Sequence, residues 1–485
     1  MRLLLINPCN ALSSMVKVKE NRWNKYRVWK PLGLLVLAAL TPKDWDVTVV
    51  DENLGPADYA GMSPPDLVGI TAFTSQAPRG YEIASEFRSR GVPVVMGGIH
   101  ASMCPEEASE WVDAVVTGEA EGVWAEVLED VRQGALKPLY EGSHADVDTI
   151  PLARHDILAG KYFFGSVQTA RGCPLNCSFC SVSAFNGRKY RRRVIEDVVQ
   201  ELRLIQEKYV LFVDDNLIGT SDEHIAGAKN LLRALIQANL GKKWIAQATI
   251  NMADDEELLQ LAVEAGCVGV YIGFESPSEE GLAEVRKKFN SRNDRDFRAS
   301  VRRIQRHGLV VAGAFIMGLD VDKPGIGERI VATANHYGVD VLNVQCLTPL
   351  PGTDLWKTME AEGRIAANAF PEDWKYYMLT LPVGRYKHLS PTDIYREMDT
   401  CNKKFYSSSR IARRMWGWLT KSRWPVFTLV SNLSNRNNAR LYRKVFWEFA
   451  ASQEARGRWS PRPSTSPSGA VPSSVASAGV SGLAP

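Results

Sequence analysis

Along residues 1–135, short apolar segments alternate with stretches of helical periodicity. Five segments are rich in Val, Ile and Leu, as buried strands are, and they lie at 2–7, 46–50, 66–73, 92–96 and 113–117. Helical stretches lie at 31–40, 81–90 and 123–133. This alternation predicts a parallel, doubly wound α/β sheet of the Rossmann-like type. Ligands of such sheets bind beyond the carboxyl ends of the strands, so the residues just after the strands are candidates for binding: Thr74, Ser75, Gly97, Gly98, His100, Gly118 and Glu119.

A second series of strands and helices follows residue 162. Six strands are expected at 166–170, 209–213, 243–248, 268–273, 310–317 and 339–346. Helical stretches separate them at 195–208, 224–239, 256–265, 294–306 and 327–337. Six such units predict a partial (βα)6 barrel of the TIM type, with its chemistry at the carboxyl ends of the strands.

The chain is therefore expected to divide into five parts. The doubly wound domain spans 1–135, a linker 136–162, the partial barrel 163–370, a helical basic region 371–450 and a tail 451–485. The linker has no clear period and contains Pro138 and Pro151. From residue 460 onward the tail consists almost entirely of Ser, Pro, Gly, Ala and Val, which predicts disorder.

Composition narrows the class of protein. With 45% hydrophobic and 23% charged residues in 485, the chain is typical of a globular protein, and no apolar run reaches 18 residues. The first ten residues are too short for a secretory signal. Eight Cys without such a signal indicate a reducing compartment, so we expect a cytoplasmic protein whose thiols bind metal or pack in cores.

Three of the eight Cys lie within eight residues, directly after the first strand of the barrel series. Cys173, Cys177 and Cys180 have the spacing C-x3-C-x2-C. A tetrahedral zinc site requires a fourth Cys or His nearby, and the nearest His in the sequence is His155. Three thiolates on one loop can instead hold three irons of a [4Fe–4S] cluster and leave the fourth iron open.

This cysteine loop, with Phe179 beside the last Cys, resembles the signature of the radical S-adenosylmethionine superfamily, and the resemblance extends over roughly residues 165–350. It implies an enzyme in which the open iron binds S-adenosylmethionine and an electron from the cluster cleaves it to methionine and a 5′-deoxyadenosyl radical. It also implies an electron donor such as flavodoxin or ferredoxin. The residues that it places at the S-adenosylmethionine are Phe179, Asp214, Asp215, Asn216, Gln247, Thr249, Glu275, Ser276, Gly313 and Ile316.

A doubly wound domain ahead of such a barrel resembles the cobalamin-binding branch of this superfamily. The resemblance rests on the strand that ends at Thr71, on the turn that begins at Gly97 and Gly98, and on the turn at Gly118 and Glu119. Glycines at such turns allow a flat corrin close backbone approach. Many cobalamin proteins place a cobalt-binding His after the first strand, but residues 7–11 contain none. Either cobalamin binds without that ligand or the domain has lost it.

The resemblance favours modification of an unactivated carbon of a small biosynthetic substrate, above all by methyl transfer. Radical cyclisation or oxidative rearrangement uses the same cofactors and stays open. Methylthio transfer to RNA is disfavoured, because residues 1–135 offer only Cys9 and Cys104 for a second cluster. A non-enzymatic sensor would require an output domain, and none is recognisable in the C-terminal 115 residues.

Two basic segments remain. Arg188–Arg193 is more in keeping with a loop that covers the cluster, or with an anionic substrate group, than with nucleic acid. Residues 401–450 contain eleven Lys and Arg against the single acid Glu448, whereas residues 1–400 carry a net charge of about −9. Within 403–450, Trp416, Trp418, Trp424, Phe427, Phe446 and Trp447 accompany these charges. The pattern fits either a peripheral contact with an anionic membrane or a helical cap on the acidic body of the protein.

Overall fold

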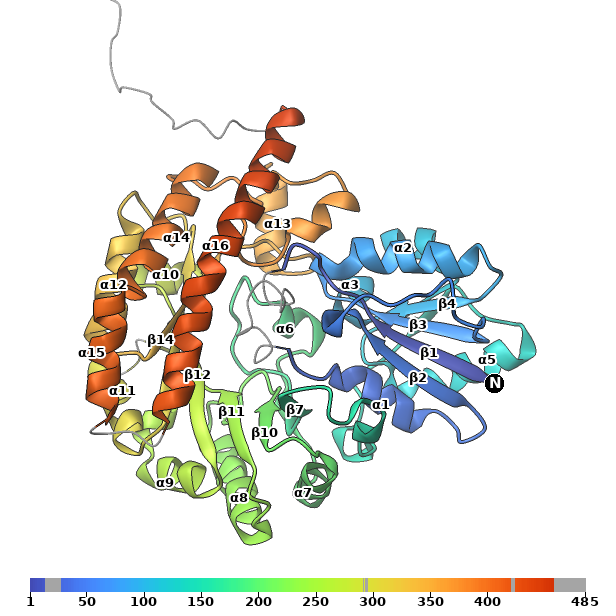
Figure 1. Cartoon of the computed structure of the whole chain (residues 1–485), viewed down its shortest axis with the longest axis horizontal. Helices are drawn as coiled ribbons and strands as arrows, with labels where there is room; N and C mark the ends of the chain where they lie inside the picture. The colour runs from blue at the N-terminus through green and yellow to red at the C-terminus, as the bar shows by residue number, and fades with distance from the viewer. Residues whose placement is uncertain (14–27, 291, 293–294, 420–423, 458–485) are drawn as a thin grey trace, which may run out of the picture.

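A computed structural model describes residues 1–13, 28–290, 292, 295–419 and 424–457. Figure 1 shows the N-terminal sheet beside a second set of strands and helices, with the C-terminal helices along the outer side of the latter. Both large sheets are parallel, as the sequence predicts.

The N-terminal sheet has the strand order β2-β1-β3-β4-β5-β6, with β1 between β2 and β3. The switch in strand order beside β1 is the place where doubly wound sheets bind ligands. Its strands are β1 (Arg2–Asn7), β2 (Asp46–Asp51), β3 (Leu67–Thr71), β4 (Val94–Gly97), β5 (Ala114–Thr117) and β6 (Leu139–Glu141). Its helices are α1 (Leu32–Leu40), α2 (Ala77–Arg88), α3 (Gly98–Met103), α4 (Pro105–Trp111) and α5 (Trp124–Gln133).

The predicted linker is not a plain connection, because it supplies the sixth strand of this sheet. β6 pairs with β5, and Tyr140 at its centre is buried and donates to Asp130 at 2.7 Å. Further along, Val147, Ile150 and Leu158 pack into the same core. A strand of three residues is too short to show a period, which is why the apolar pattern did not reveal it.

The second sheet has its strands in sequential order from β7 to β14, as in part of a TIM barrel, and all of its pairs are parallel. The strands are β7 (Phe164–Val167), β10 (Tyr209–Phe212), β11 (Lys243–Gln247), β12 (Cys267–Glu275), β13 (Val310–Met317) and β14 (Val341–Cys346). The helices are α7 (Ile195–Leu204), α8 (Asp222–Ala238), α9 (Glu256–Glu264), α10 (Glu279–Glu284), α11 (Phe297–Arg306) and α12 (Ile326–Tyr337).

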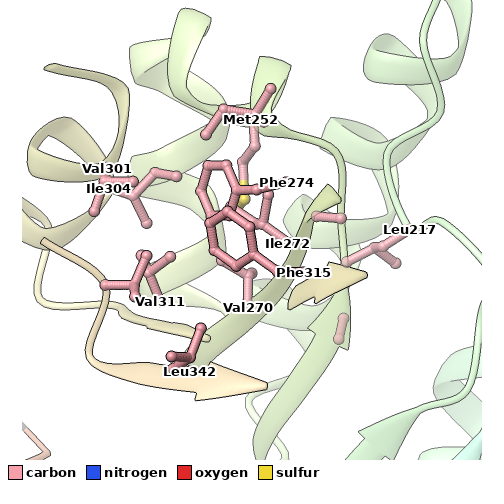
Figure 2. Close-up of a cluster of buried hydrophobic side chains, with 14 of the residues drawn as sticks. Leu217, Met252, Val270, Ile272, Phe274, Val301, Ile304, Val311, Phe315 and Leu342 are labelled. Carbon is pink, nitrogen blue, oxygen red and sulfur yellow. The ribbon is translucent and has the colours of Figure 1, made fainter. Parts of the chain in front are cut away.

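The core of the barrel half lies between the sheet and its outer helices. Figure 2 shows Phe274 of β12 and Phe315 of β13 packed together near Val301 and Ile304 of α11. The two phenylalanine rings are stacked with centroids 5.7 Å apart. Phe315 faces the outer helices. Because successive residues of a strand face opposite sides, the next residue, Ile316, faces the inner side of the barrel.

The C-terminal region contains α13 (Asp354–Ala361), α14 (Pro391–Phe405), α15 (Ser408–Leu419) and α16 (Pro425–Ala455). Residues 371–390, expected to be helical, form one short 3-10 turn at Glu372–Tyr376 and otherwise irregular structure. Phe449 of α16 packs on Tyr376, and both belong to a hydrophobic core that also contains Tyr81 and Phe87 of α2, so this region contacts the N-terminal half. Residues 451–455 of the predicted tail (451–485) are the last turns of α16, so the tail begins later than expected, and residues 458–485 lie outside the described residues. None of the helices described here has the length and apolar character that a bilayer crossing requires.

Candidate functional site

The three clustered cysteines lie on a loop between β8 (Ala170–Arg171) and α6 (Ser181–Phe185). The loop begins at Gly172, which has φ +84°, and a Cβ there would come within 2.3 Å of the Lys189 carbonyl oxygen. Ser178 holds its middle, donating through its backbone N–H to Val285 at 3.3 Å and accepting from that of Leu355 at 2.9 Å. The loop is therefore fixed between β9 (Arg191–Arg192), the turn after α10 and the start of α13.

The environment of the thiols suits an iron–sulfur cluster. All three cysteines are free of disulfides and part-exposed. Burial raises the pKa of Cys173 and of Cys180, while backbone N–H groups that point at both sulfurs favour the thiolate form. No three His, Cys, Asp or Glu side chains of the described residues are placed to hold one shared metal ion. Thiolates that each bind a different iron of a cubane stand farther apart than ligands of a single ion.

The two aspartates after β10 hold the protein's own backbone. Asp214 is fully buried and accepts hydrogen bonds from Thr169, through its N–H and its hydroxyl, and from the N–H of Ala170. Burial raises its pKa to about 6, against the effect of these bonds. Asp215 accepts from the N–H of Gly172 at 3.2 Å and from Asn186 at 3.0 Å. Both carboxylates thus position the cysteine loop, and Asp215 also borders the cavity described below.

The next polar residues connect the cysteine loop to the following strand. Asn216 donates to Thr249 at 3.3 Å, and its side chain favours the thiolate form of Cys173. Asn251 donates to Gly219, and its Oδ1 is buried without a donor among the described residues. Gln247 is exposed. An unpaired buried acceptor just after the end of β11 suits a ligand that brings N–H or O–H groups, such as S-adenosylmethionine.

At the end of β12 the chain forms a buried ion pair that sequence reasoning missed. Lys287 pairs with Glu275, whose φ is +66°, an uncommon conformation for a residue other than glycine. Gly273 makes this possible, since a Cβ there would lie 2.6 Å from the Lys287 ammonium nitrogen. Burial opposes the charge of Lys287, but Glu275 and then Cys177 outweigh it and raise its pKa. Asn290 lies beside the pair, donates to Gly273 at 2.9 Å and leaves its Oδ1 buried without a partner in the described chain.

The remaining predicted S-adenosylmethionine residues are placed as follows. Phe179 is half-buried against the barrel core. Ser276 is buried and accepts from the N–H of Ser278 at 3.2 Å, and Ile316 is buried on β13. A Cβ at Gly313 would meet the Phe274 ring at 3.1 Å, so the packing of Phe274 by itself accounts for this glycine.

A cavity of about 420 Å³ lies between the two halves of the molecule, within the size range of ligand pockets. One wall comes from the N-terminal sheet and includes Thr71, Gly97, Gly98, Gly118 and Glu119, all predicted from the sequence. The opposite wall belongs to the barrel half and includes Asp215, which the sequence predicted as a contact of S-adenosylmethionine. Sequence reasoning missed the rest of this wall: Gln168, Arg171, Ser181, Val182, Phe185 and Asn186. Since Arg171 and Ser181 flank the cysteine loop, the cavity lies directly beside that loop.

The other candidates in the N-terminal half lie outside the cavity lining. Thr74 is buried and Ser75 half-buried in the turn that precedes α2. His100 is fully buried, with its Nε2 2.9 Å from the Tyr81 hydroxyl and 3.3 Å from Glu107. Its side chain belongs to an internal polar network, and no His of the described residues lines the cavity.

Gly98 and Gly118 were expected to be glycines so that a corrin could approach the backbone, but the structure gives another reason. At Gly98, with φ +87°, a Cβ would lie 2.5 Å from the Thr71 hydroxyl. At Gly118, with φ +67°, it would lie 2.2 Å from the carbonyl oxygen of Gly142. The close approach of the chain to itself requires both glycines, whether or not a corrin is bound.

Glu119 joins the two walls of the cavity electrostatically. Its carboxylate pairs with Arg171, at 2.9 Å, and with Arg191, and it accepts from the N–H of Ala145 at 2.8 Å. Burial opposes ionisation of Glu119, but the Arg191 hydrogen bond and the Arg171 charge outweigh it and lower the pKa. The basic segment Arg188–Arg193 is thus used in part to hold the cysteine loop against the N-terminal sheet. Within it, Arg193 likewise pairs with buried Glu201 at 2.8 Å.

Gly33 offers a direct test of the cavity. It lines the cavity, and a Cβ placed on it meets no atom within 4 Å. Gly33→Leu should therefore fill the cavity without strain, and a leucine inside α1 even favours the helix. We expect Gly33→Leu to lose cobalamin in equilibrium dialysis while Gly33→Ala keeps it, both with unchanged iron content. Equal retention by the two variants would place cobalamin elsewhere.

Comparison with known proteins agrees with this geometry. Residues 167–325 match the model of the radical SAM superfamily, and residues 25–128 match that of the B12 binding domain. The chain is 28% identical over 455 residues to a bacteriochlorophyllide d C-12(1)-methyltransferase of Chlorobaculum tepidum, with 90% of this chain and 94% of that protein covered. It is 31% identical over 374 residues to an uncharacterised methyltransferase of Synechocystis sp., with 75% and 69% covered.

The fold has a counterpart among solved structures. The radical S-adenosylmethionine methyltransferase TsrM from Kitasatospora setae, with cobalamin and a [4Fe-4S] cluster bound, superposes with a TM-score of 0.64 at 19% identity, over 90% of this chain and 99% of that one. Fold and site together define an enzyme in which a partial barrel carrying the cysteine loop follows a doubly wound domain of the cobalamin-binding type. The chain belongs to the cobalamin-binding branch of the radical S-adenosylmethionine superfamily. The cofactors of this branch are a [4Fe–4S] cluster, S-adenosylmethionine and cobalamin, as the sequence predicts.

Proposed function

We propose that this enzyme methylates an unactivated carbon of a small, largely apolar biosynthetic substrate. The observation that carries the proposal is the shared cavity, whose walls are the cobalamin-type sheet on one side and residues that flank the cysteine loop on the other. When bound, the cluster and S-adenosylmethionine supply a carbon-centred radical and cobalamin carries the methyl group. The named methyltransferase of Chlorobaculum tepidum, similar over nearly its whole length, supports methyl transfer.

The chain's own residues would position and shield these groups. Cys173, Cys177 and Cys180 would hold the cluster. The Lys287 ammonium, between Glu275 and the cysteine loop, would attract the carboxylate of S-adenosylmethionine, while the unpaired Oδ1 atoms of Asn251 and Asn290 would accept its donors.

The apolar part of the cavity lining suits a hydrophobic partner and excludes water from a reactive radical. Leu32, Val36, Leu37 and Trp124 contribute to it.

An electron donor such as flavodoxin or ferredoxin would have to reach the cluster from outside. Cyclisation or rearrangement on the same scaffold is the alternative, because it requires the same residues. Methylthio transfer would require a second cluster, and Cys9 and Cys104 are poor ligands for one. Burial raises the pKa of both thiols, and they lie at different places, Cys9 beside Glu52 and Cys104 beside Glu107.

A metabolite comparison distinguishes methylation from its alternative. A strain without the gene, grown beside the parent strain on methionine with a deuterated methyl group, should lose one compound and accumulate a precursor that is lighter by one CH2. In the parent, the compound that disappears should carry the deuterium. A precursor with the same number of carbon atoms as the lost compound would contradict methyl transfer and favour cyclisation.

A further inference from the structure

The C-terminal helices carry more basic side chains than the fold uses. One group of these side chains fixes the helices to the rest of the protein. Lys403 and Arg443 pair with Asp399 at 2.5 and 3.1 Å, and Lys404 pairs with Glu328. Phe446 is buried and stacks on Tyr395 with ring centroids 4.2 Å apart, as the helical-cap alternative expects. This part of the C-terminal region forms the helical cap that was one of the two alternatives suggested by the sequence.

A second group is not neutralised. Arg410, Arg413 and Arg440 are exposed and form no ion pair with any acid of the described chain. Arg436 is exposed and donates to the neutral hydroxyl of Ser408 at 3.0 Å. Lys444 is 3.9 Å from Glu448, at the limit of an ion pair. Uncompensated positive charge therefore remains on this side of the molecule.

Large apolar side chains are exposed among these charges. Trp416 is 76% exposed, Val426 71% and Trp447 47%. At about 100° per residue, Val426, Arg440 and Trp447 of α16 fall within about a quarter of the helix circumference, and Arg436 and Lys444 fall within the same arc. Helix α15 lies beside this helix, as the bond from Arg436 to Ser408 requires (Figure 1). We call this surface, formed by Arg410, Arg413, Trp416, Val426, Arg436, Arg440, Lys444 and Trp447, the basic aromatic face.

The position of the start of α16 argues against an electron donor that docks at this end of the face. Trp424, at the start of α16, lies 5.8 Å from the ammonium of Lys243, which is the first residue of β11. The start of α16 is therefore at the amino ends of the barrel strands, whereas the cysteine loop follows their carboxyl ends. An acidic redox protein must bring its cofactor close to the cluster, and docking at the start of α16 would keep it on the opposite edge of the sheet.

We propose that the basic aromatic face binds the surface of an anionic lipid bilayer. Exposed tryptophan lies at the level of lipid headgroups, and Lys and Arg meet the anionic lipids beside it. An apolar substrate of the kind proposed above dissolves in such a bilayer, although the membrane contact does not depend on that substrate. The face covers helix surfaces only, so the enzyme would lie on the membrane and not span it.

Sedimentation of the reconstituted full-length enzyme with vesicles tests the proposal. We expect binding to phosphatidylglycerol-containing vesicles at low salt, weaker binding at high salt, and little binding to pure phosphatidylcholine. Since each basic residue near such a surface contributes about fivefold to partitioning, Arg413→Glu with Arg440→Glu should weaken binding by at least about 25-fold. Trp416→Ser should weaken it in the same direction, because it removes an interfacial anchor.

Lys43→Glu with Lys323→Glu is the matched control, because both lysines are exposed, lie outside α15 and α16 and give the same change in charge. It should bind vesicles nearly as the parent does. If the control and the test variant lost vesicle binding equally, net charge alone would explain the loss, and the proposal would be overturned. It would also be overturned by vesicle binding that is absent at low salt, or by a test variant that binds vesicles normally but is no longer reduced by flavodoxin.

Discussion

Alanine at Cys173, Cys177 and Cys180 together is expected to abolish the iron–sulfur cluster. The three thiols lie on one loop held by Gly172 and Ser178, and no other Cys of the described chain lies on that loop. Without thiolates the irons have no protein ligands there. After anaerobic reconstitution, the triple variant should contain no bound iron or sulfide, lack the visible absorbance of the cluster and form no 5′-deoxyadenosine from S-adenosylmethionine.

Cys9→Ser with Cys104→Ser is the matched control. These cysteines lie in the N-terminal half, and burial raises the pKa of both. The double variant should keep the iron content of the parent, because one cluster is expected per chain. A full cluster in the triple variant would refute the assignment, and loss of half of the iron in the control would reveal a second cluster in the N-terminal half.

Glu119→Gln is expected to cause the second-largest effect. The side chain of Glu119 is 2% exposed and faces Arg171 and Arg191, which are themselves about nine-tenths buried. Removing one partner of a buried ion pair leaves an uncompensated charge and typically costs about 3–5 kcal/mol. Because Arg171 leads directly into the cysteine loop, this variant should lose both thermal stability and retained cobalamin.

The measurement is the thermal unfolding midpoint of the full chain, with cobalamin retention measured on the same sample. Glu129→Gln serves as control, since Glu129 is exposed and its contact with Arg132 spans 3.6 Å. An exposed pair of this kind contributes about 0–1 kcal/mol, so the midpoint should hardly move. If Glu119→Gln had the same unfolding midpoint as Glu129→Gln and kept its cobalamin, the ion pairs of Glu119 with Arg171 and Arg191 would not join the two halves of the molecule.

The apolar pattern predicted most of the strands, because a buried parallel strand reads as an unbroken run of Val, Ile and Leu. β1 and β13 have the predicted bounds, and both sheets are parallel as expected. What the pattern could not show is β6. This strand is three residues long, and its place in the sheet depends on tertiary contacts of Tyr140.

The candidate site was predictable where chemistry is local in sequence and not where it depends on packing. The cysteine loop and the residues after β3, β4 and β5 were recognisable from spacing and strand ends. That Asp214 holds Thr169 and Ala170 requires knowledge of the bonds themselves. Lys287 lies twelve residues after Glu275, beyond a helix, and only the fold brings the two together. No local signal in the sequence could have found this pair.

The central claim is that one enzyme holds the cluster and cobalamin on either side of a shared cavity. The most direct measurement is made on the anaerobically reconstituted full-length chain, with its iron, its retained cobalamin and its 5′-deoxyadenosine determined on one sample after reduction with S-adenosylmethionine present. We predict one [4Fe–4S] cluster and one cobalamin per chain, together with formation of 5′-deoxyadenosine. A chain that holds the full cluster but retains no cobalamin, or that forms no 5′-deoxyadenosine, would contradict this account.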